Sequence, residues 1–305
     1  MAQSRARYIV GTLIIIVILA IAAGVYCFTH SSLYALHGVR YLAGPFQSRT
    51  LYEMDWRGPK EVTLPVSGHV IDYARENGHE AAITLSDDSS SVYTIENGKA
   101  KKRVSDDATK SSIDISSDGT MVAYAERIAT SSAATTPNIF YAPDGWEIML
   151  LGPNDTEPHS LGQGYAPHFF TKGGKQYLAY TTINGLHFVD IATNTHQDVS
   201  LDRSAQPDWF FTAAVSSDGE YAAVPVSSSY SLFALNLQNG SFTLSPAGTL
   251  PPYTNTVAFS GPRILTGAGA VNNSQTLLRL LPISAPDTIA YGKVYPYVQV
   301  YKVIP

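Results

Sequence analysis

The sequence predicts an all-β domain built from a repeated four-stranded unit and preceded by one apolar helix. Two observations indicate the repeat: a hairpin with a glycine turn recurs along the chain, and an apolar strand follows each hairpin. A third observation, an uncharged run near the N-terminus, indicates the helix. The composition agrees, since 23 Gly, 18 Pro and 19 Tyr favour turns and strands over helices.

The uncharged run covers residues 8–28, and its 21 residues are about enough helix to cross a ~30 Å hydrocarbon core. Arg5 and Arg7 precede it, whereas the first positive residue after it is Arg40. That asymmetry predicts a cytoplasmic N-terminus and an exported remainder. The alternative is a cleaved signal peptide, because residues 20–22 (Ala-Ile-Ala) have the small-x-small pattern of a cleavage site.

Charge and cysteine content argue against a nucleic-acid-binding protein and against a disulfide-stabilised one. A net charge of -5 gives no basic field for nucleic acid. The only cysteine, Cys27, lies inside the uncharged run, so the exported part can form no internal disulfide. That part must be stabilised by burial of its own core.

The hairpin repeat is clearest at residues 113–124 and 213–224, where Ser-Ser-Asp-Gly separates two apolar strands. Weaker copies surround Gly78, Gly173 and Gly261. Asp-Gly and Asn-Gly supply the positive backbone dihedrals that tight hairpin turns require. The apolar strands that follow are spaced by 41, 56, 38, 46 and 45 residues, and they begin at Leu51, Val92, Ile148, Leu186, Leu232 and Leu277.

Four short strands in every forty-odd residues describe the blade of a β-propeller. The six strand copies predict six blades, over residues 49–305, with a cytoplasmic stub over 1–7 and a tether over 29–48. Because no hairpin precedes Leu51, we expect the strand-like segment Lys293–Val303 to complete that blade. Within the tether, Arg40-Tyr41-Leu42 is a candidate to pair with the ring.

These residues also carry a family resemblance. Ser-Ser-Asp-Gly before an apolar strand, and then Leu-Tyr-Glu-Met-Asp at 51–55, resembles the TolB-type, WD40-like propeller repeat over about residues 49–290. Ser117 and Ser217 replace the proline of the family pattern, and the blade at Lys172 lacks the aspartate. The resemblance implies the architecture but no single function, because this repeat serves binding proteins, peptidase side domains and scaffolds alike.

Paired carboxylates are the strongest candidates for catalysis. Asp72 and Asp114 occupy similar places in adjacent inner strands, as a propeller glycosidase would require. In the next blades the corresponding residues are Phe169 and Ala214, so a polar ring is not sustained. We therefore expect Asp72 and Asp114 to lie at the channel edge or to cap turns, and we expect no enzyme.

Metal and cofactor signals are lacking. His159 and His168 are nine residues apart with no carboxylate in ligand register. There is no phosphate-binding glycine loop, nucleophile elbow or repeated tryptophan pattern for a quinone. The sequence therefore predicts neither a metal site nor a cofactor site.

A basic run comprises Lys99, Lys101, Lys102 and Arg103, and Asp106 and Asp107 follow it closely. Such runs are commonly solvated strand edges that discourage edge-to-edge pairing. The alternative is a site for an anionic polymer or a lipid surface.

The 56-residue interval contains an insert over residues 128–146. Its first half is rich in Ser, Thr and Ala, and its second half places Phe140, Tyr141 and Trp146 in a loop. Exposed aromatic residues on a loop of a rigid scaffold are suited to binding a partner. We predict these three residues as the partner-binding site. The alternative is that they fold back over their own blade.

Together these features predict a single-pass protein of the cytoplasmic membrane whose propeller lies outside the cytoplasm. We expect it to act as a binding or scaffold module for an envelope protein or other ligand, without catalysis. The alternatives are a propeller hydrolase acting on envelope glycans and a structural subunit of a membrane complex. Convergent channel carboxylates would favour the hydrolase, and a large apolar surface would favour the structural subunit.

Overall fold

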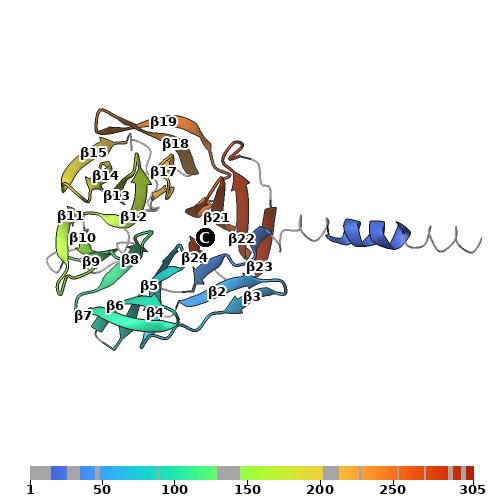
Figure 1. Ribbon diagram of the computed structural model, residues 1–305, viewed down its shortest axis with the longest axis horizontal. Helices are drawn as coiled ribbons and strands as arrows, with labels where there is room; N and C mark the ends of the chain where they lie inside the picture. The colour runs from blue at the N-terminus through green and yellow to red at the C-terminus, as the bar shows by residue number, and fades with distance from the viewer. Residues whose placement is uncertain are drawn as a thin grey trace, which may run out of the picture.

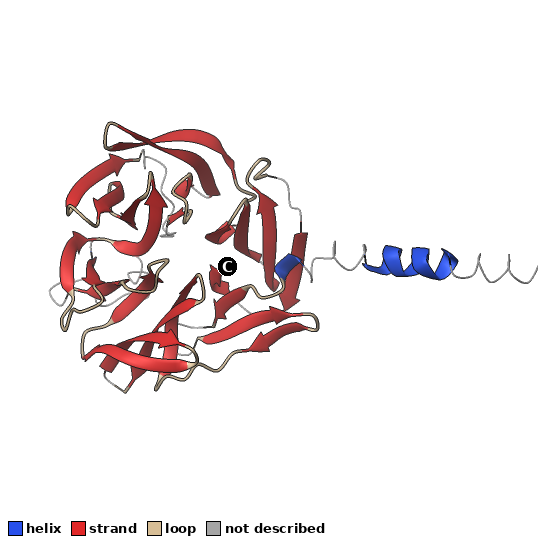
Figure 2. Cartoon of the chain, in the orientation of Figure 1, coloured by secondary structure: helices blue, strands red, loops and turns tan. Residues whose placement is uncertain are grey.

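The computed structural model describes residues 15–25, 35–44, 49–87, 89–128, 145–201, 213–226, 229–252, 254–270, 273–287, 291–296 and 300–305. Nearly all of this part of the chain is strand and turn (Figure 2). The strands form six antiparallel four-stranded sheets, arranged as blades around a common centre (Figure 1). The predicted six-bladed β-propeller is confirmed.

Each blade runs from an inner strand at the centre of the ring to an outer strand at its edge. In that order, blades 1 to 3 are β24 (Val300–Ile304), β1 (Arg40–Ala43), β2 (Thr50–Asp55), β3 (Gly58–Glu61); β4 (His69–Glu76), β5 (His79–Ser86), β6 (Ser89–Glu96), β7 (Lys99–Asp106); and β8 (Lys110–Ile115), β9 (Val122–Arg127), β10 (Trp146–Leu151), β11 (His159–Gln163). Blades 4 to 6 are β12 (Tyr165–Lys172), β13 (Lys175–Thr181), β14 (Gly185–Asp190), β15 (Thr195–Ser200); β16 (Ala214–Val215), β17 (Tyr221–Val226), β18 (Ser229–Gln238), β19 (Ser241–Thr249); and β20 (Thr254–Ser260), β21 (Arg263–Ala270), β22 (Asn273–Pro282), β23 (Tyr291–Pro296).

The two ends of the domain close the ring inside blade 1. β24 pairs antiparallel with β1, which in turn pairs with β2, and the C-terminus lies at the centre of the ring (Figure 1). The expected closure by the C-terminal segment is confirmed, with one correction. Lys293 lies in β23, the outer strand of blade 6, so only β24 completes blade 1.

The start of the propeller also needs correction. Arg40–Ala43 lies inside the segment expected to be a tether, yet it forms β1, as its candidate pairing suggested. Leu36 is fully buried, and Gly38 N donates to Met54 O at 2.8 Å. The propeller therefore begins at or before Leu36 and not at residue 49, because β24 needs β1 to connect it to the rest of blade 1.

The core consists of apolar clusters that each join two neighbouring blades. One cluster places Leu42 and Ile304 of blade 1 against Tyr73 and Ile95 of blade 2. The other described clusters join blades 2 and 3, 3 and 4, 4 and 5, 5 and 6, and 6 and 1. Since burial of apolar surface contributes roughly 25 cal/mol per Å², every blade stabilises the ring through both of its neighbours.

The Ser-Ser-Asp-Gly turns have the same geometry in blades 3 and 5. Ser116 Oγ donates to Asp118 Oδ1 at 2.7 Å, and Ser216 Oγ donates to Asp218 Oδ1 at 2.6 Å. Gly119 has a φ of 73°, and a Cβ there would lie 2.3 Å from the His79 ring of the preceding blade. Glycine is therefore required both for the turn and for its contact with blade 2.

Residues 15–25 form the described part of the predicted anchor, and they are helical. Among the residues described, no helix has the length and apolar character needed to cross a membrane.

Candidate functional site

Four charged or titratable side chains from four inner strands lie at the centre of the ring. They are Asp72 on β4, Asp114 on β8, His168 on β12 and Lys302 on β24. β4 packs on β8, β8 on β12, β12 on β16, β16 on β20 and β20 on β24. A polar ring is not sustained in blade 5, where β16 is Ala214–Val215, but His168 and Lys302 add two polar groups that the sequence analysis did not place at the centre.

Asp72 joins three strands. Its side chain is fully buried, and Oδ1 accepts from Tyr73 N at 2.7 Å and from Lys302 Nζ at 3.1 Å. Oδ2 accepts from Ile113 N of blade 3 at 3.1 Å, and Lys302 Nζ also donates to Ile113 O at 2.8 Å. One ion pair therefore connects the closing strand to both blade 2 and blade 3.

Asp114 and His168 continue this pattern to the next blades. Asp114 Oδ2 accepts from Phe169 N of blade 4 at 2.7 Å, and His168 Nε2 donates to Ala213 O, just before β16, at 3.0 Å. Burial raises the pKa of Asp114 to about 7, although Lys302 and the amide of Phe169 lower it. Burial and Lys302 lower the pKa of His168 to about 4. His168 is therefore neutral at pH 7, with its proton on Nε2.

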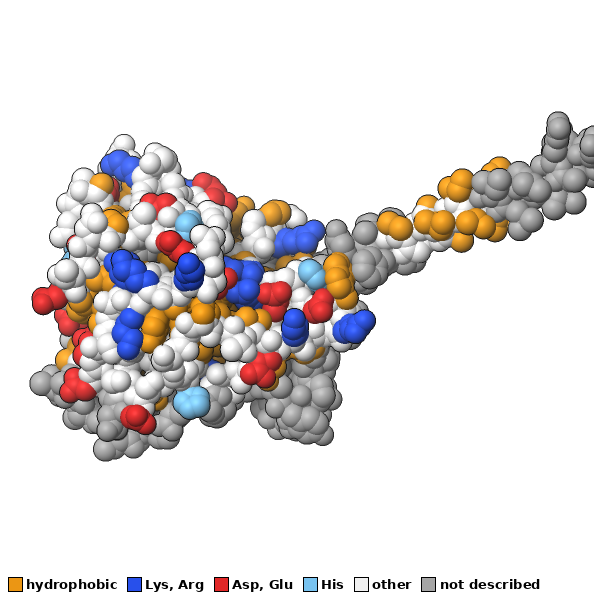
Figure 3. Space-filling model, turned by 60° about the horizontal axis from the view of Figure 1, so that its bottom comes forward, with side chains coloured by type: hydrophobic (Ala, Val, Ile, Leu, Met, Phe, Trp, Pro, Cys, Tyr) orange, Lys and Arg blue, Asp and Glu red, His pale blue; other side chains and the backbone are white. Residues whose placement is uncertain are grey.

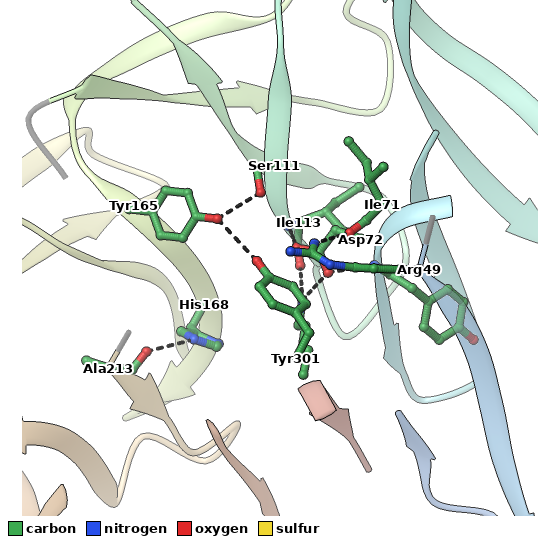
Figure 4. Close-up of polar contacts among 11 residues, drawn as sticks. Arg49, Ile71, Asp72, Ser111, Ile113, Tyr165, His168, Ala213 and Tyr301 are labelled. Atoms are coloured by element: carbon green, nitrogen blue, oxygen red, sulfur yellow. Dashed lines mark hydrogen bonds and ion pairs between the residues drawn. The ribbon is translucent and has the colours of Figure 1, made fainter. Parts of the chain in front are cut away.

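A second group of contacts surrounds Tyr301 on β24 (Figure 4). The Arg49 guanidinium lies 3.1 Å from the centroid of the Tyr301 ring, and Arg49 Nη1 donates to the carbonyl of Ile71. The Tyr301 hydroxyl is 3.2 Å from that of Tyr165, which is 2.8 Å from Ser111 Oγ. The closing strand is thus connected to blades 3 and 4 through side-chain hydroxyls, and to the main chain of blade 2 through Arg49.

The C-terminal residue has its own partner. Arg75 of β4 donates to Pro305 O from Nε at 3.1 Å and from Nη2 at 2.6 Å, and its Nη2 also donates to Gly38 O at 2.9 Å. The first and last described segments of the propeller therefore converge on a single arginine of blade 2.

The central carboxylates are occupied by these contacts. Asp72 has no exposed surface, and both of its oxygens accept hydrogen bonds from groups that connect strands. Asp114 is partly exposed, and one of its oxygens bonds the next blade. The arrangement fits the expected structural role at the channel edge. Its chemistry is that of fixed inter-blade contacts, and Asp114, whose pKa is raised to about 7, keeps part of its surface exposed.

Histidines elsewhere do not assemble a metal centre in the described part of the chain. His159 is on the outer strand β11 of blade 3, whereas His168 is on the inner strand β12 of blade 4. In blade 4, His187 bonds Asp198 at 2.7 Å and His196 at 2.9 Å, so its two ring nitrogens are both engaged. No group of three or more His, Cys, Asp or Glu suited to a metal occurs among the residues described.

Of the three predicted partner-binding residues, the structure describes only Trp146. Trp146 is 1% exposed, begins β10 and packs edge-on against Tyr165 at 5.3 Å, so its expected place in an exposed loop is wrong. The reason is local pairing, because Ile128 N donates to Gly145 O at 3.1 Å and Trp146 then continues the blade. Phe140 and Tyr141 lie outside the described residues, and their role stays a prediction.

Sequence reasoning missed Lys302 and Arg49, and it considered His168 only as a metal ligand. A usable signal existed for Lys302, because this lysine lies among the apolar residues of a segment already expected to close the ring. For His168 and Arg49 there was none. Their roles depend on contacts to main-chain carbonyls of other blades, which no local pattern encodes.

No protein-family model and no curated protein matches the chain. Solved structures are similar to it, among them TolB from Acinetobacter baumannii, at a TM-score of 0.54 and 13% identity over 87% of this chain and 66% of that one. The putative TolB from Agrobacterium tumefaciens gives a TM-score of 0.51 and 11% identity over 86% of this chain and 98% of that one.

A functionally unknown protein from Desulfotomaculum acetoxidans DSM 771 is similar too, with a TM-score of 0.51 and 11% identity over 84% and 80% of the two chains. The chain spans slightly less than two thirds of the Acinetobacter protein. At these identities the likeness concerns the fold and not the activity. The chain has a TolB-like six-bladed β-propeller fold.

Proposed function

We propose that this chain is a membrane-anchored, extracytoplasmic propeller that binds or scaffolds an envelope protein or other ligand and performs no catalysis. The observation that supports this most is the state of the central carboxylates. Asp72 is fully buried and accepts from Ile113 N and Lys302 Nζ, so it is used to connect strands. A rigid ring of this kind presents its surface loops and edges to a partner.

The anchor in this proposal rests on residues 8–28, which carry no charge. In the described helix over residues 15–25, the large apolar side chains are exposed by 52–62%. Exposed apolar surface of this extent is suited to lipid or to another helix. The positive residues Arg5 and Arg7 favour an N-terminus inside the cytoplasm.

The test of binding uses a photo-crosslinking amino acid at Phe140 or Tyr141 of the full chain in intact cells. We expect a discrete adduct from each position, with the same partner identified by mass spectrometry. The matched control is the same amino acid at Thr193, an exposed turn residue of blade 4, which should give no such adduct. Equal adducts from all three positions would contradict a specific site in the insert.

A second candidate, a propeller hydrolase for envelope glycans, is favoured by one observation. The pKa of Asp114 is raised to about 7 by burial, and its side chain is partly exposed, which suits a general acid. The discriminating variant is Asp114→Asn, whose side-chain oxygen can still accept from Phe169 N. The hydrolase would be established if the parent chain releases soluble glycan fragments and the variant does not. Binding would be favoured if the parent chain and the variant both form the photo-crosslinked adduct.

A further inference from the structure

The outer edges of blades 1 and 2 carry a set of five exposed cations, which we call the basic rim: Arg57, Lys60, Lys99, Lys101 and Lys102. Arg57 and Lys60 lie in the β2–β3 turn and on β3, and the three other lysines lie on β7. Figure 3 brings forward the side of the propeller that holds β2 to β7, and Lys and Arg side chains are spread across it. The rim thus spans the outer strands of two neighbouring blades, with other side chains between its cations.

These cations have no ion-pair partner within the described ranges of the chain. The other basic residues nearby are engaged: Arg103 Nη2 donates to Gly152 O at 2.7 Å, and Arg40 Nε pairs with Glu53 at 2.8 Å. Exposed acids share the edge, namely Glu61, Glu96, Asp106 and Asp107, of which Asp106 pairs with Lys110. The rim therefore keeps an excess of positive charge, although the whole chain has a net charge of -5.

Protection of strand edges does not account for this placement. Lysines on an edge strand discourage pairing with other chains. If that were the reason, the other outer strands would need them as well. β11, β15 and β19 contain no Lys or Arg at all, whereas β23 contains Lys293. Cations on outer strands therefore occur on three consecutive blades, 6, 1 and 2, and Leu36, at the start of the propeller, lies in the cluster that joins blades 6 and 1.

The entry point adds an aromatic group to the rim. Trp56, beside Arg57, is 41% exposed, and its ring stacks on His37 at 3.8 Å between centroids. Tryptophan is favoured at the boundary between headgroups and hydrocarbon, where its ring meets both apolar and polar surroundings. If the proposed anchor ends at residue 28, the six residues 29–34 span at most about 20 Å. Blade 1 is then kept close to the membrane surface.

We propose that the basic rim, with Trp56, binds the anionic phospholipid headgroups of the membrane that the N-terminal segment enters. This inference rests on the anchor of the proposed function, and it adds an orientation: the propeller stands on the edge formed by blades 1 and 2. Each cation near an anionic surface raises partitioning about fivefold, so the rim and the anchor together provide two attachments.

The experiment uses the full chain with Cys27→Ser and a single fluorophore at Thr63→Cys, an exposed residue after β3. The matched position is Thr193→Cys on blade 4, across the ring from blade 1. In vesicles with about 30 mol% phosphatidylglycerol we expect a blue-shifted emission at residue 63 and none at 193. The shift should disappear in phosphatidylcholine vesicles and at about 0.5 M NaCl.

Charge variants test the residues themselves. Lys101→Gln with Lys102→Gln should lower partitioning to phosphatidylglycerol vesicles by about 25-fold. Lys175→Gln with Arg263→Gln removes the same charge from exposed residues of blades 4 and 6 and should change it less than threefold. Equal losses for the two pairs, or an equal shift at residues 63 and 193, would overturn the proposal.

The failure of the anchor can be told apart from that of the rim. If the anchor fails, the chain does not float with phosphatidylcholine vesicles. Salt-sensitive flotation with phosphatidylglycerol vesicles would in that case still support the rim. No flotation with phosphatidylglycerol vesicles would overturn the rim proposal. Soluble polyphosphate serves as the probe for an anionic polymer. Binding of polyphosphate through Lys101 and Lys102 without any lipid dependence would assign the rim to a polymer and overturn the membrane proposal.

Discussion

The centre of the ring and the basic rim both carry charged side chains, but those at the centre are hydrogen-bonded between blades and those at the rim are exposed to solvent. At the centre, Asp72, Asp114, His168 and Lys302 each bond a group on another blade or on the segment leading into one. At the rim, five exposed cations on adjacent blades lack any ion pair in the part of the chain that the structure describes. The same kinds of side chain thus connect blades at one place and face solvent at the other.

The difference has an energetic consequence. Removing one partner of a buried ion pair typically destabilises a protein by about 3–5 kcal/mol, because a buried charge is left without compensation. Changing an exposed charge usually alters stability by less than about 0.5 kcal/mol. Central charges should therefore affect the folded state, and rim charges should affect association with little change in folding.

The largest expected effect comes from removing the closing strand. Deleting residues 300–305 takes away the buried Val300, Val303 and Ile304, exposes the edge of β1, and leaves Asp72 without Lys302. We expect loss of cooperative unfolding and aggregation through the open edge. Circular dichroism during heating and light scattering provide the measurement. A truncated chain that melts as cooperatively as the intact one would contradict closure by β24.

The next effect isolates the central ion pair. In Asp72→Asn the side chain has one acceptor oxygen where three donors converge: Tyr73 N, Ile113 N and Lys302 Nζ. We expect the free energy of unfolding to fall by about 3–5 kcal/mol, measured by urea denaturation. Asp72→Asn combined with Lys302→Met should recover part of the loss. Lys101→Gln on the rim is the control, and a loss as large as that of Asp72→Asn would remove the distinction between centre and rim.

How far the sequence predicts these features depends on how local they are. The Asp118 and Asp218 turns were identifiable because a tight turn needs an Asp-Gly pair and an oxygen acceptor within a few residues. The six repeated strands and closure by the C-terminal segment followed from counting apolar strands. All of these depend on short-range pattern or on the number of repeats.

The rest depends on contacts between blades. Trp146 is expected in a loop because it is the last residue of the insert, and only its pairing with Arg127 of β9 places it in a strand. His168 bonds the main chain of Ala213, 45 residues later. Since a carbonyl is present at every residue, the sequence contains no mark of which one will be the partner. The central site was therefore predictable in its aspartates and not in its connections.

The smallest expected effect is on the pH dependence of stability, to which Asp114 and His168 contribute in opposite directions. The pKa of Asp114 is raised to about 7, so the folded chain binds more protons than the unfolded chain between about pH 4 and 7. Its contribution to stability is present at low pH and is lost as the pH rises through 7. The pKa of His168 is lowered to about 4, so its contribution is present above about pH 6.5 and is lost as the pH falls through 4.

Asp114→Asn should therefore gain stability relative to the parent chain as the pH rises from about 4 to 8, by about 1–2 kcal/mol. His168→Gln keeps a donor for Ala213 O and should show a flatter loss of stability between about pH 6.5 and 4. Urea denaturation at about pH 4.5, 6 and 8 measures both slopes. Because burial at the centre causes both shifts, the two variants must change the pH profile in opposite directions. Profiles parallel to that of the parent chain would show that the centre is as hydrated as the rim.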